Sequence, residues 1–341
     1  TASVVSHAKT LGYEPSSCRA PIATVNISLT TTSPTKTMPA GTAFTSSVDG
    51  TSYQFVTIAD ITASNIGNAV AFDSTSLYEG TYVTVKYVVD TSDVEQRFIL
   101  TDNRADTTTL RVRVQTSVSD STVTTYTKAT DITQLSATSS VYFLQEVENG
   151  RFEVYFGDDV VSKALSDGNV VILKYVVTNK TAANGASSFS APSSIDGVSA
   201  ITTTTVTSAS GGAEPESMDS IKLQAPLDFA SQGRAVTTED YKVYARKLFP
   251  NTQAVSVWGG EDGSFDPSLG VSSTPEYGKV FISIKSTTGL NLSDAQKSQL
   301  VKDLNKFKVA SVTPVIVDAD TTFIILGCLL YTSDAADDAN C

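Results

Sequence analysis

The sequence is poor in the residues that most enzymes and metalloproteins use for chemistry. It has one histidine, three cysteines and one tryptophan in 341 residues. A Ser-His-Asp or Cys-His site needs a histidine close to its nucleophile, and His7 lies far in sequence from any plausible partner. A zinc site needs several Cys or His ligands. We therefore expect no catalytic residues, no metal site and no bound cofactor.

Long apolar runs are lacking as well. A membrane-spanning helix needs roughly 18 consecutive apolar residues. The runs at 170–177 and 281–284 have only the length of strands. The sequence therefore predicts no insertion into a membrane.

Basic residues are few relative to acidic ones. The chain has 24 Lys and Arg against 36 Asp and Glu, a net charge of −12, and only Arg246 and Lys247 are adjacent basic residues. A nucleic-acid surface needs a basic patch that displaces counterions from phosphates. Scattered basic residues in an acidic chain predict no nucleic-acid partner.

The last residues resemble a translated sequencing adapter. Residues 328–338 read Cys-Leu-Leu-Tyr-Thr-Ser-Asp-Ala-Ala-Asp-Asp, which a transposase-end adapter encodes in one reading frame. We expect 328–341 to be an artefact and the natural chain to end near Gly327, with a net charge of −9 once three acids are removed. The start at Thr1 is expected to be cut as well. Cys18 is then a single thiol, which cannot form an internal disulfide.

Residues 20–210 have the pattern of a β-rich region. Val25, Ile27 and Leu29 alternate with polar residues, which places apolar side chains on one face of a strand. The Thr-rich run 202–207 fits a half-exposed strand, with an O-glycosylated stalk as the alternative. Further strands are expected at 82–89, 110–114, 152–156 and 170–177. Their spacing predicts a β-sandwich or small barrel, in one or two modules.

Helical periodicity brackets this β-rich region. Residues 1–19 read as the end of a helical segment, and residues 211–327 are expected to form an α+β domain. Pro215 is placed at the first helical position of the latter. Pro226 is expected to end or kink that helix. The predicted fold class is therefore mixed β and α+β.

Two capping boxes predict further helices in residues 211–327. One pairs Thr237 with Asp240, and the other pairs Ser293 with Gln296. The second helix should bury an apolar face against strands predicted around it. That face consists of Leu300, Leu304 and Phe307, and the strands it should contact are 279–285 and 312–317. Strands are also expected at 254–258 and 323–326.

Paired carboxylates are the remaining candidates for chemistry, because such pairs serve glycosidases or bind calcium. Each pair adjoins a glycine or a loop, and none has the spacing of a calcium loop, so turns and strand ends are favoured. The run 259–262, Gly-Gly-Glu-Asp, is similar to the signature of diguanylate cyclases, but a turn after a strand is favoured here too. The pairs are Asp158 with Asp159, Glu261 with Asp262, and Asp318 with Asp320.

Short motifs in a fixed order between Leu11 and Asp318 carry a family resemblance. The most specific block is Gly-Gly-Ala-Glu-Pro-Glu-Ser at 211–217, which leads to Gln-Gly-Arg-Ala-Val-Thr at 232–237 and Glu-Asp-Tyr at 239–241. Together the motifs resemble the baseplate J-like and wedge-subunit family of contractile-tailed phages. The other motifs lie at 38–42, 53–55, 77–81, 142–146, 155–158 and 183–186, and those at 257–262 and 277–282 resemble wedge subunits of larger myophages in particular.

The resemblance implies a structural subunit and no enzyme. Such a subunit belongs to the ring of wedges around the central hub, takes part in baseplate assembly and rearranges when the sheath contracts. Its implied partners are other wedge proteins and copies of itself, with no small-molecule substrate. Its implied location is the virion tail baseplate, and the host cytoplasm during assembly.

Two other functions stay open at this point. One is a β-rich virion or secreted adhesin that binds glycans. The helices expected after Gly211 argue against it, because a plain β-stalk has no need of them. The other is a hydrolase, which would require two carboxylates roughly 5 to 9.5 Å apart in a cleft.

Overall fold

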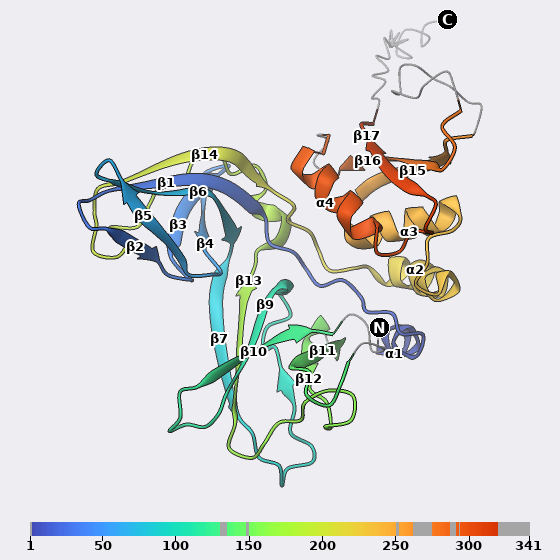
Figure 1. Cartoon of the computed structure of the whole chain (residues 1–341), viewed down its shortest axis with the longest axis horizontal. Helices are drawn as coiled ribbons and strands as arrows, with labels where there is room; N and C mark the ends of the chain where they lie inside the picture. Colours follow the sequence, from blue (N-terminus) through green and yellow to red (C-terminus); the bar gives the residue numbers. More distant parts are fainter. Residues whose placement is uncertain are drawn as a thin grey trace, which may run out of the picture.

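Three sheets organise the chain. The computed structural model describes residues 2–129, 135–147, 150–249, 252–261, 275–286, 291–292 and 294–319. Two seven-stranded sheets form a first and a second β unit, and a three-stranded sheet with helices forms an α+β unit (Figure 1). The predicted fold class, β modules followed by an α+β segment, is confirmed.

The first β unit curls into a nearly closed barrel. Its longest pairings join β1 to β6 and β14, both antiparallel. The alternation predicted for β1 is confirmed, because Val25, Ile27 and Leu29 are at most 1% exposed. The strands are β1 (Ile22–Thr30), β2 (Thr35–Met38), β3 (Ala43–Val48), β4 (Thr51–Val56), β5 (Ile61–Ile66), β6 (Ala69–Glu79) and β14 (Ile201–Ser210), which contains the Thr-rich run.

The second β unit is inserted between β6 and β14 of the first. Its strand order is β7-β13-β9-β10-β11-β12-β8. The Tyr87 hydroxyl donates to the Ile99 carbonyl at 2.6 Å, which ties the two edge strands together. The strands are β7 (Thr81–Val88), β8 (Phe98–Ile99), β9 (Ala105–Gln115), β10 (Val123–Lys128), β11 (Val141–Glu146), β12 (Phe152–Tyr155) and β13 (Val170–Val177), and the short helix η3 (Lys180–Ala183) leads back toward β14.

In the α+β unit, helices pack on a small mixed sheet. Strand β16 pairs antiparallel with β15 and parallel with β17. The predicted apolar face of α4 is confirmed: Leu300 and Leu304 are buried in the core, and the Phe307 ring stacks on Tyr244 at 4.3 Å. The elements are α2 (Met218–Ser231), α3 (Thr238–Leu248), β15 (Thr252–Gly259), β16 (Lys279–Ser286), α4 (Asp294–Leu304) and β17 (Thr313–Val317).

Helix α2 differs from the prediction at Pro215. It begins at Met218, with the Ser217 side chain accepting from the Ser220 amide, so Pro215 lies outside the helix. A Ser cap supplies an acceptor that Pro at the first position cannot. Pro226 does not end α2, which continues to Ser231. The proline ring faces solvent, where the carbonyl it leaves free can be hydrated.

Helix α1 (Ala2–Thr10) packs on α2 although it is far away in sequence (Figure 1). Ala8 and Tyr13 are buried against Ile221 and Ala225. The buried side of α2 therefore faces the N-terminal segment. The N-terminal helix thus lies with the α+β unit in space.

Of the remaining sequence expectations, one is confirmed and others concern residues outside the described ranges. The capping box of Thr237 and Asp240 is confirmed at the start of α3. Ser293, the strand expected at 323–326 and the adapter-like residues 328–341 lie outside the described residues. Of the helices in the described part, none has the length and apolar character of a membrane span.

Candidate functional site

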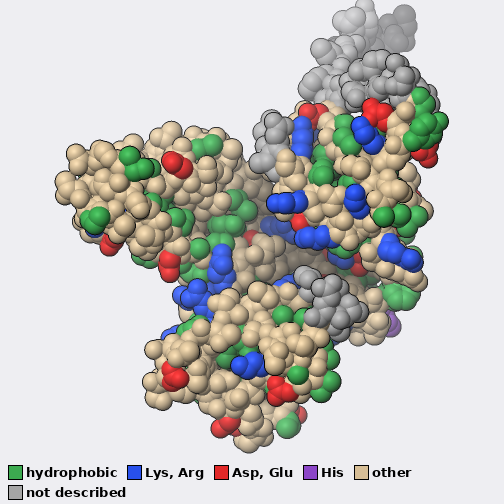
Figure 2. Space-filling model, in the orientation of Figure 1, with side chains coloured by type: hydrophobic (Ala, Val, Ile, Leu, Met, Phe, Trp, Pro, Cys, Tyr) green, Lys and Arg blue, Asp and Glu red, His purple; other side chains and the backbone are tan. Residues whose placement is uncertain are grey.

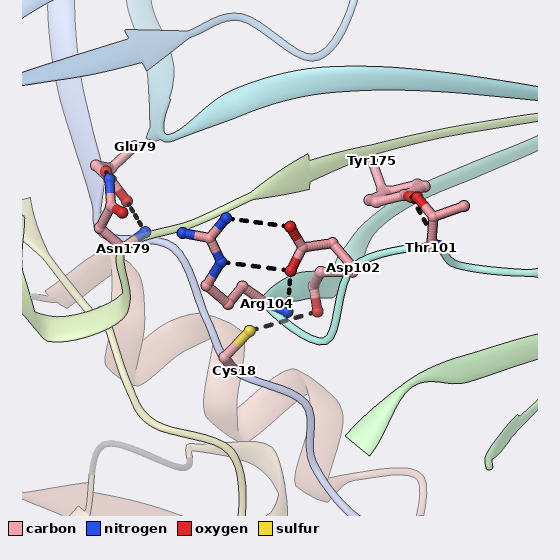
Figure 3. Close-up of polar contacts among 8 residues, drawn as sticks. Cys18, Glu79, Thr101, Asp102, Arg104, Tyr175 and Asn179 are labelled. Atoms are coloured by element: carbon pink, nitrogen blue, oxygen red, sulfur yellow. Dashed lines mark hydrogen bonds and ion pairs between the residues drawn. The ribbon is translucent and has the colours of Figure 1, made fainter. Parts of the chain in front are cut away.

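The junction between the two β units is held by a buried carboxylate. Glu79 ends β6 and is fully buried. Its carboxylate accepts from the Thr178 hydroxyl at 2.6 Å. It also accepts from the side-chain amide of Asn179 at 2.7 Å and from the backbone amide of Asn179 at 2.9 Å (Figure 3). Both donors belong to the chain segment that returns from β13. One side chain therefore ties the outgoing connection to the returning one.

Gly80 forms the outgoing connection itself. It has φ +122°, a backbone conformation that only glycine adopts readily. A Cβ atom there would lie 2.2 Å from the carbonyl oxygen of Val177. The two crossings between the units thus run in contact, with no space for a side chain.

A second buried carboxylate attaches the N-terminal segment to the same junction. Asp106, at the start of β9, accepts from the Ala20 amide at 2.9 Å through one oxygen. Its other oxygen accepts from the amide and the hydroxyl of Thr108 at 2.9 and 2.6 Å. Buried carboxylates are costly unless hydrogen-bonded, and these bonds satisfy Asp106. Three chain segments therefore meet at a polar, buried contact.

Cys18 lies in this segment and is buried. Its thiol points to the Ala105 carbonyl, with Sγ 3.5 Å from the oxygen (Figure 3). Burial is the main cause that raises the pKa of the thiol to about 12. Since the thiolate is the nucleophile, Cys18 is an inert packing residue.

Three further contacts stiffen the loop beside the junction. Arg104 and Asp102 form an ion pair at 3.1 Å, and the hydrogen bonds from Arg104 lower the pKa of the Asp102 carboxyl. Thr101 bonds to the Tyr175 hydroxyl through its amide and its hydroxyl (Figure 3). The Thr178 amide donates to the Arg104 carbonyl at 3.1 Å. This loop is therefore attached to the returning strand at both of its ends.

A separate polar cluster joins the N-terminal segment to the α+β unit. The Glu216 carboxylate accepts from the Tyr13 hydroxyl at 2.8 Å, the Ser16 amide at 3.1 Å and the Ser220 hydroxyl at 2.7 Å. An open cleft adjoins this cluster, with Arg246 also in its lining. Burial is the main cause that raises the pKa of Tyr13. The neutral tyrosine thus serves as a donor that holds the start of α2.

The residues that the sequence offered as candidates for chemistry do not lie together in one site. His7 is exposed on α1, Asp158 and Asp159 lie in an exposed loop, and Asp318 pairs with Lys297 at 2.9 Å. Glu261 is exposed, and its sequence neighbour Asp262 and Asp320 lie outside the described residues. Among the described residues, no three His, Cys, Asp or Glu side chains are grouped as a metal site requires.

Sequence reasoning missed Glu79 and Asp106, the residues that hold the junction. The partner that ties each to another segment is distant in sequence: Ala20 lies 86 positions from Asp106, and Asn179 lies 100 positions from Glu79. Each carboxylate sits in an otherwise ordinary strand pattern. The one available signal was an acidic residue directly before Gly80, within the motif at 77–81.

Two family models match separate parts of the chain. Residues 85–186 match the one described as bacteriophage baseplate wedge protein gp6, third domain. Residues 237–317 match the one described as baseplate structural protein gp6, C-terminal domain I. The first match begins and ends close to the inserted second β unit, and the second lies within the α+β unit.

Similar whole proteins are found as well. Baseplate wedge protein gp6 of Enterobacteria phage T4 is 27% identical over 352 aligned residues, which cover 94% of this chain and 50% of the relative. The chain thus spans about half the length of this curated relative. A chain in the cryo-EM structure of the anti-feeding prophage (AFP) baseplate, six-fold symmetrised, is 13% identical with a TM-score of 0.31, covering 92% of this chain and 60% of that one.

Proposed function

Because the chain belongs to the phage baseplate wedge protein gp6 family, and so to a multi-protein tail baseplate, we propose that it joins neighbouring wedge proteins and copies of itself. We also propose that it takes part in the rearrangement that accompanies sheath contraction. The observation that carries this is the relative matched along 94% of the chain, with two family models in sequence order. The function is structural, as the family descriptions state.

The built junction supports a force-bearing role. Glu79 and Asp106 fix the two β units to each other with buried hydrogen bonds that relate segments far apart in sequence. Fully satisfied buried polar networks rigidify a structure. The two β units would then move as one body during a rearrangement.

Contacts between this β pair and the α+β unit are of a different kind. Lys180 pairs with Glu214 at 2.6 Å, and Lys128 pairs with Glu14 at 2.6 Å, with side chains that are 27 to 61% exposed. Exposed ion pairs contribute roughly 0 to 1 kcal/mol each. Such contacts can be exchanged at low cost. We therefore place the relative movement of the β pair and the α+β unit at the boundary beside the Glu216 cluster.

The test of this function uses the full-length protein together with the neighbouring wedge proteins of its phage. Mass photometry or sedimentation should detect a defined hetero-oligomer. A monodisperse monomer that hydrolyses a glycan or nucleotide, and loses turnover when Asp158 or Glu261 is changed, would contradict the proposal. The α+β unit with its capped helices α2 and α3 gives no support to a plain β-stalk adhesin.

A further inference from the structure

Four cations share the outer face of the second β unit. They are Lys86 on β7, Arg111 and Arg113 on β9, and Lys174 on β13. Lys174 is in register with Arg111, and Ile172 lies between Lys86 and Arg113. Alternate residues of a strand point to the same face, so the four occupy two neighbouring rows, opposite the core residues Val112 and Leu173. We call these four residues the basic face.

The basic face has no acidic partner within the described chain. None of its four residues takes part in an ion pair there. Lys86, Arg111 and Arg113 are exposed, and Lys174 is half-buried. Figure 2 shows Lys and Arg side chains gathered along the left side of this unit. The expectation that basic residues are scattered is thus wrong for this face, because strand register brings distant residues together.

The far end of the same unit carries the opposite charge. Its three loops, 89–96, 116–122 and 157–169, are tied together: the Thr91 amide donates to Asp167 at 3.1 Å, and the Asn169 side-chain amide donates to the Thr116 carbonyl at 2.8 Å. We call these loops the acidic end. Figure 2 shows acidic side chains at the lower end of the molecule, where this unit lies.

Carboxylates dominate the acidic end, and Lys163 is its one basic residue. None of the carboxylates is ion-paired within the described chain. Each loop also exposes most of the surface of one valine: Val94 at 94%, Val118 at 75% and Val160 at 73%. The carboxylates are Asp90, Asp93, Glu95, Asp120, Asp158, Asp159 and Asp167.

We infer that the basic face of one copy binds the acidic end of a second copy. This rests on the proposed self-association and names its surfaces. A chain of net charge −12 repels its own copies over most of its surface, and the basic face is where a neighbour's carboxylates are attracted. The exposed valines would pack on the sheet surface beside Lys86 and Arg113.

The pairing joins two different surfaces, so it is heterologous and builds a ring or an open row of subunits. That fits a subunit of a multi-protein baseplate better than a closed pair would. Nucleic acid is disfavoured as the occupant, because the acidic end of the same β unit carries seven carboxylates against the four cations of the basic face, and the carboxylates repel phosphates.

Zero-length coupling tests the pairing directly. Full-length protein labelled with ¹⁵N is mixed with unlabelled protein, assembled with its wedge proteins, and treated with a carbodiimide that joins amines to carboxylates in ion pairs. We expect mixed-isotope amides between Lys86 or Lys174 of one copy and the acidic end of another. Lys222, exposed on α2, is the matched control and should give no such link.

Variants provide the second measurement. Lys86→Gln with Lys174→Gln should weaken association between copies at least tenfold, whereas Lys222→Gln with Lys242→Gln should leave it unchanged. Circular dichroism checks that both variants fold. Three outcomes would overturn the inference while leaving the proposed function intact. They are links from the basic face to another protein, links that are lost after nuclease treatment, and assembled copies without mixed-isotope links. If the full-length protein assembles with nothing, both fail.

Discussion

Glu79 and Asn179 lie one hundred positions apart, yet the carboxylate of the first accepts both the side-chain amide and the backbone amide of the second, at 2.7 and 2.9 Å. These bonds close the second β unit into a loop of chain that leaves and re-enters the first unit at one place. Separating a buried carboxylate from its hydrogen-bond donors is costly, because the carboxylate and the donors would each be left buried without a partner.

The first prediction concerns this carboxylate. Glu79→Gln replaces one acceptor oxygen by an amide that faces the donors of Thr178 and Asn179. Leaving buried donors unsatisfied should lower the free energy of unfolding by roughly 1 to 3 kcal/mol. Urea unfolding at neutral pH measures the change. Glu95→Gln, in an exposed loop, is the control. If Glu79→Gln loses less than about 0.5 kcal/mol, as is typical of surface sites, the junction bonds do not contribute to the free energy of unfolding.

The second prediction concerns the close approach at Gly80. Alanine there meets the Val177 carbonyl at 2.2 Å and is also held at positive φ, so strand β6 or β13 must shift. We expect a loss of roughly 2 to 4 kcal/mol in thermal or urea unfolding. Gly67 also has a positive φ, at +62°, but a Cβ added there by Gly67→Ala would lie in open space. This substitution should cost about 1 kcal/mol. Equal losses at both sites would show that φ alone matters and that the crossings do not press on each other.

The third prediction concerns the core of the α+β unit. Leu304 is fully buried among the helices and the sheet. Leu304→Ala should lower the free energy of unfolding by roughly 2 to 5 kcal/mol through lost transfer energy and a cavity. Leu223→Ala on α2, whose leucine is 58% exposed, is the control. A similar small change in both variants would contradict the assigned core.

The sequence predicted the elements of this fold better than their connections. Strand 170–177 was predicted with the bounds that β13 has, because its β-branched residues and flanking turns are local signals. The insertion of one β unit into the other was not predictable, since it depends on pairing between β1 and the distant β14. The division at residue 211 remains a proposal, and α1 would join the α+β unit on its packing with α2.

The same limit applies to the candidate site. Paired carboxylates such as Asp158 and Asp159 attracted notice because they are adjacent in sequence, yet they lie exposed in a loop. Nothing in the sequence indicated that Glu79 and Asp106 are buried, because the segments that bury them lie about 90 to 100 residues away. Long-range register likewise assembles the basic face from three strands.

The last prediction concerns stability in acid. Arg97 donates two hydrogen bonds to Glu153, at 2.9 and 2.8 Å, and these lower the pKa of the Glu153 carboxyl below its usual 4.5. The unfolded chain therefore takes up this proton first as the pH falls. The contribution of Glu153 is fully present above about pH 4.5 and is lost as the pH drops through the folded-state pKa. The free energy of unfolding should thus decline on acidification in that range.

Two variants isolate this contribution from that of the other carboxylates. Glu153→Gln removes the titrating group, and Arg97→Met removes the cation that shifts its pKa. Urea unfolding measured from pH 7 to pH 3 should show lower stability at pH 7 for both variants and a shallower decline below pH 4.5 than in the unmodified protein. The two curves should resemble each other, because each change breaks the same ion pair. If either variant keeps the full acid decline, Glu153 is not ionised through Arg97, and the decline must come from other carboxylates.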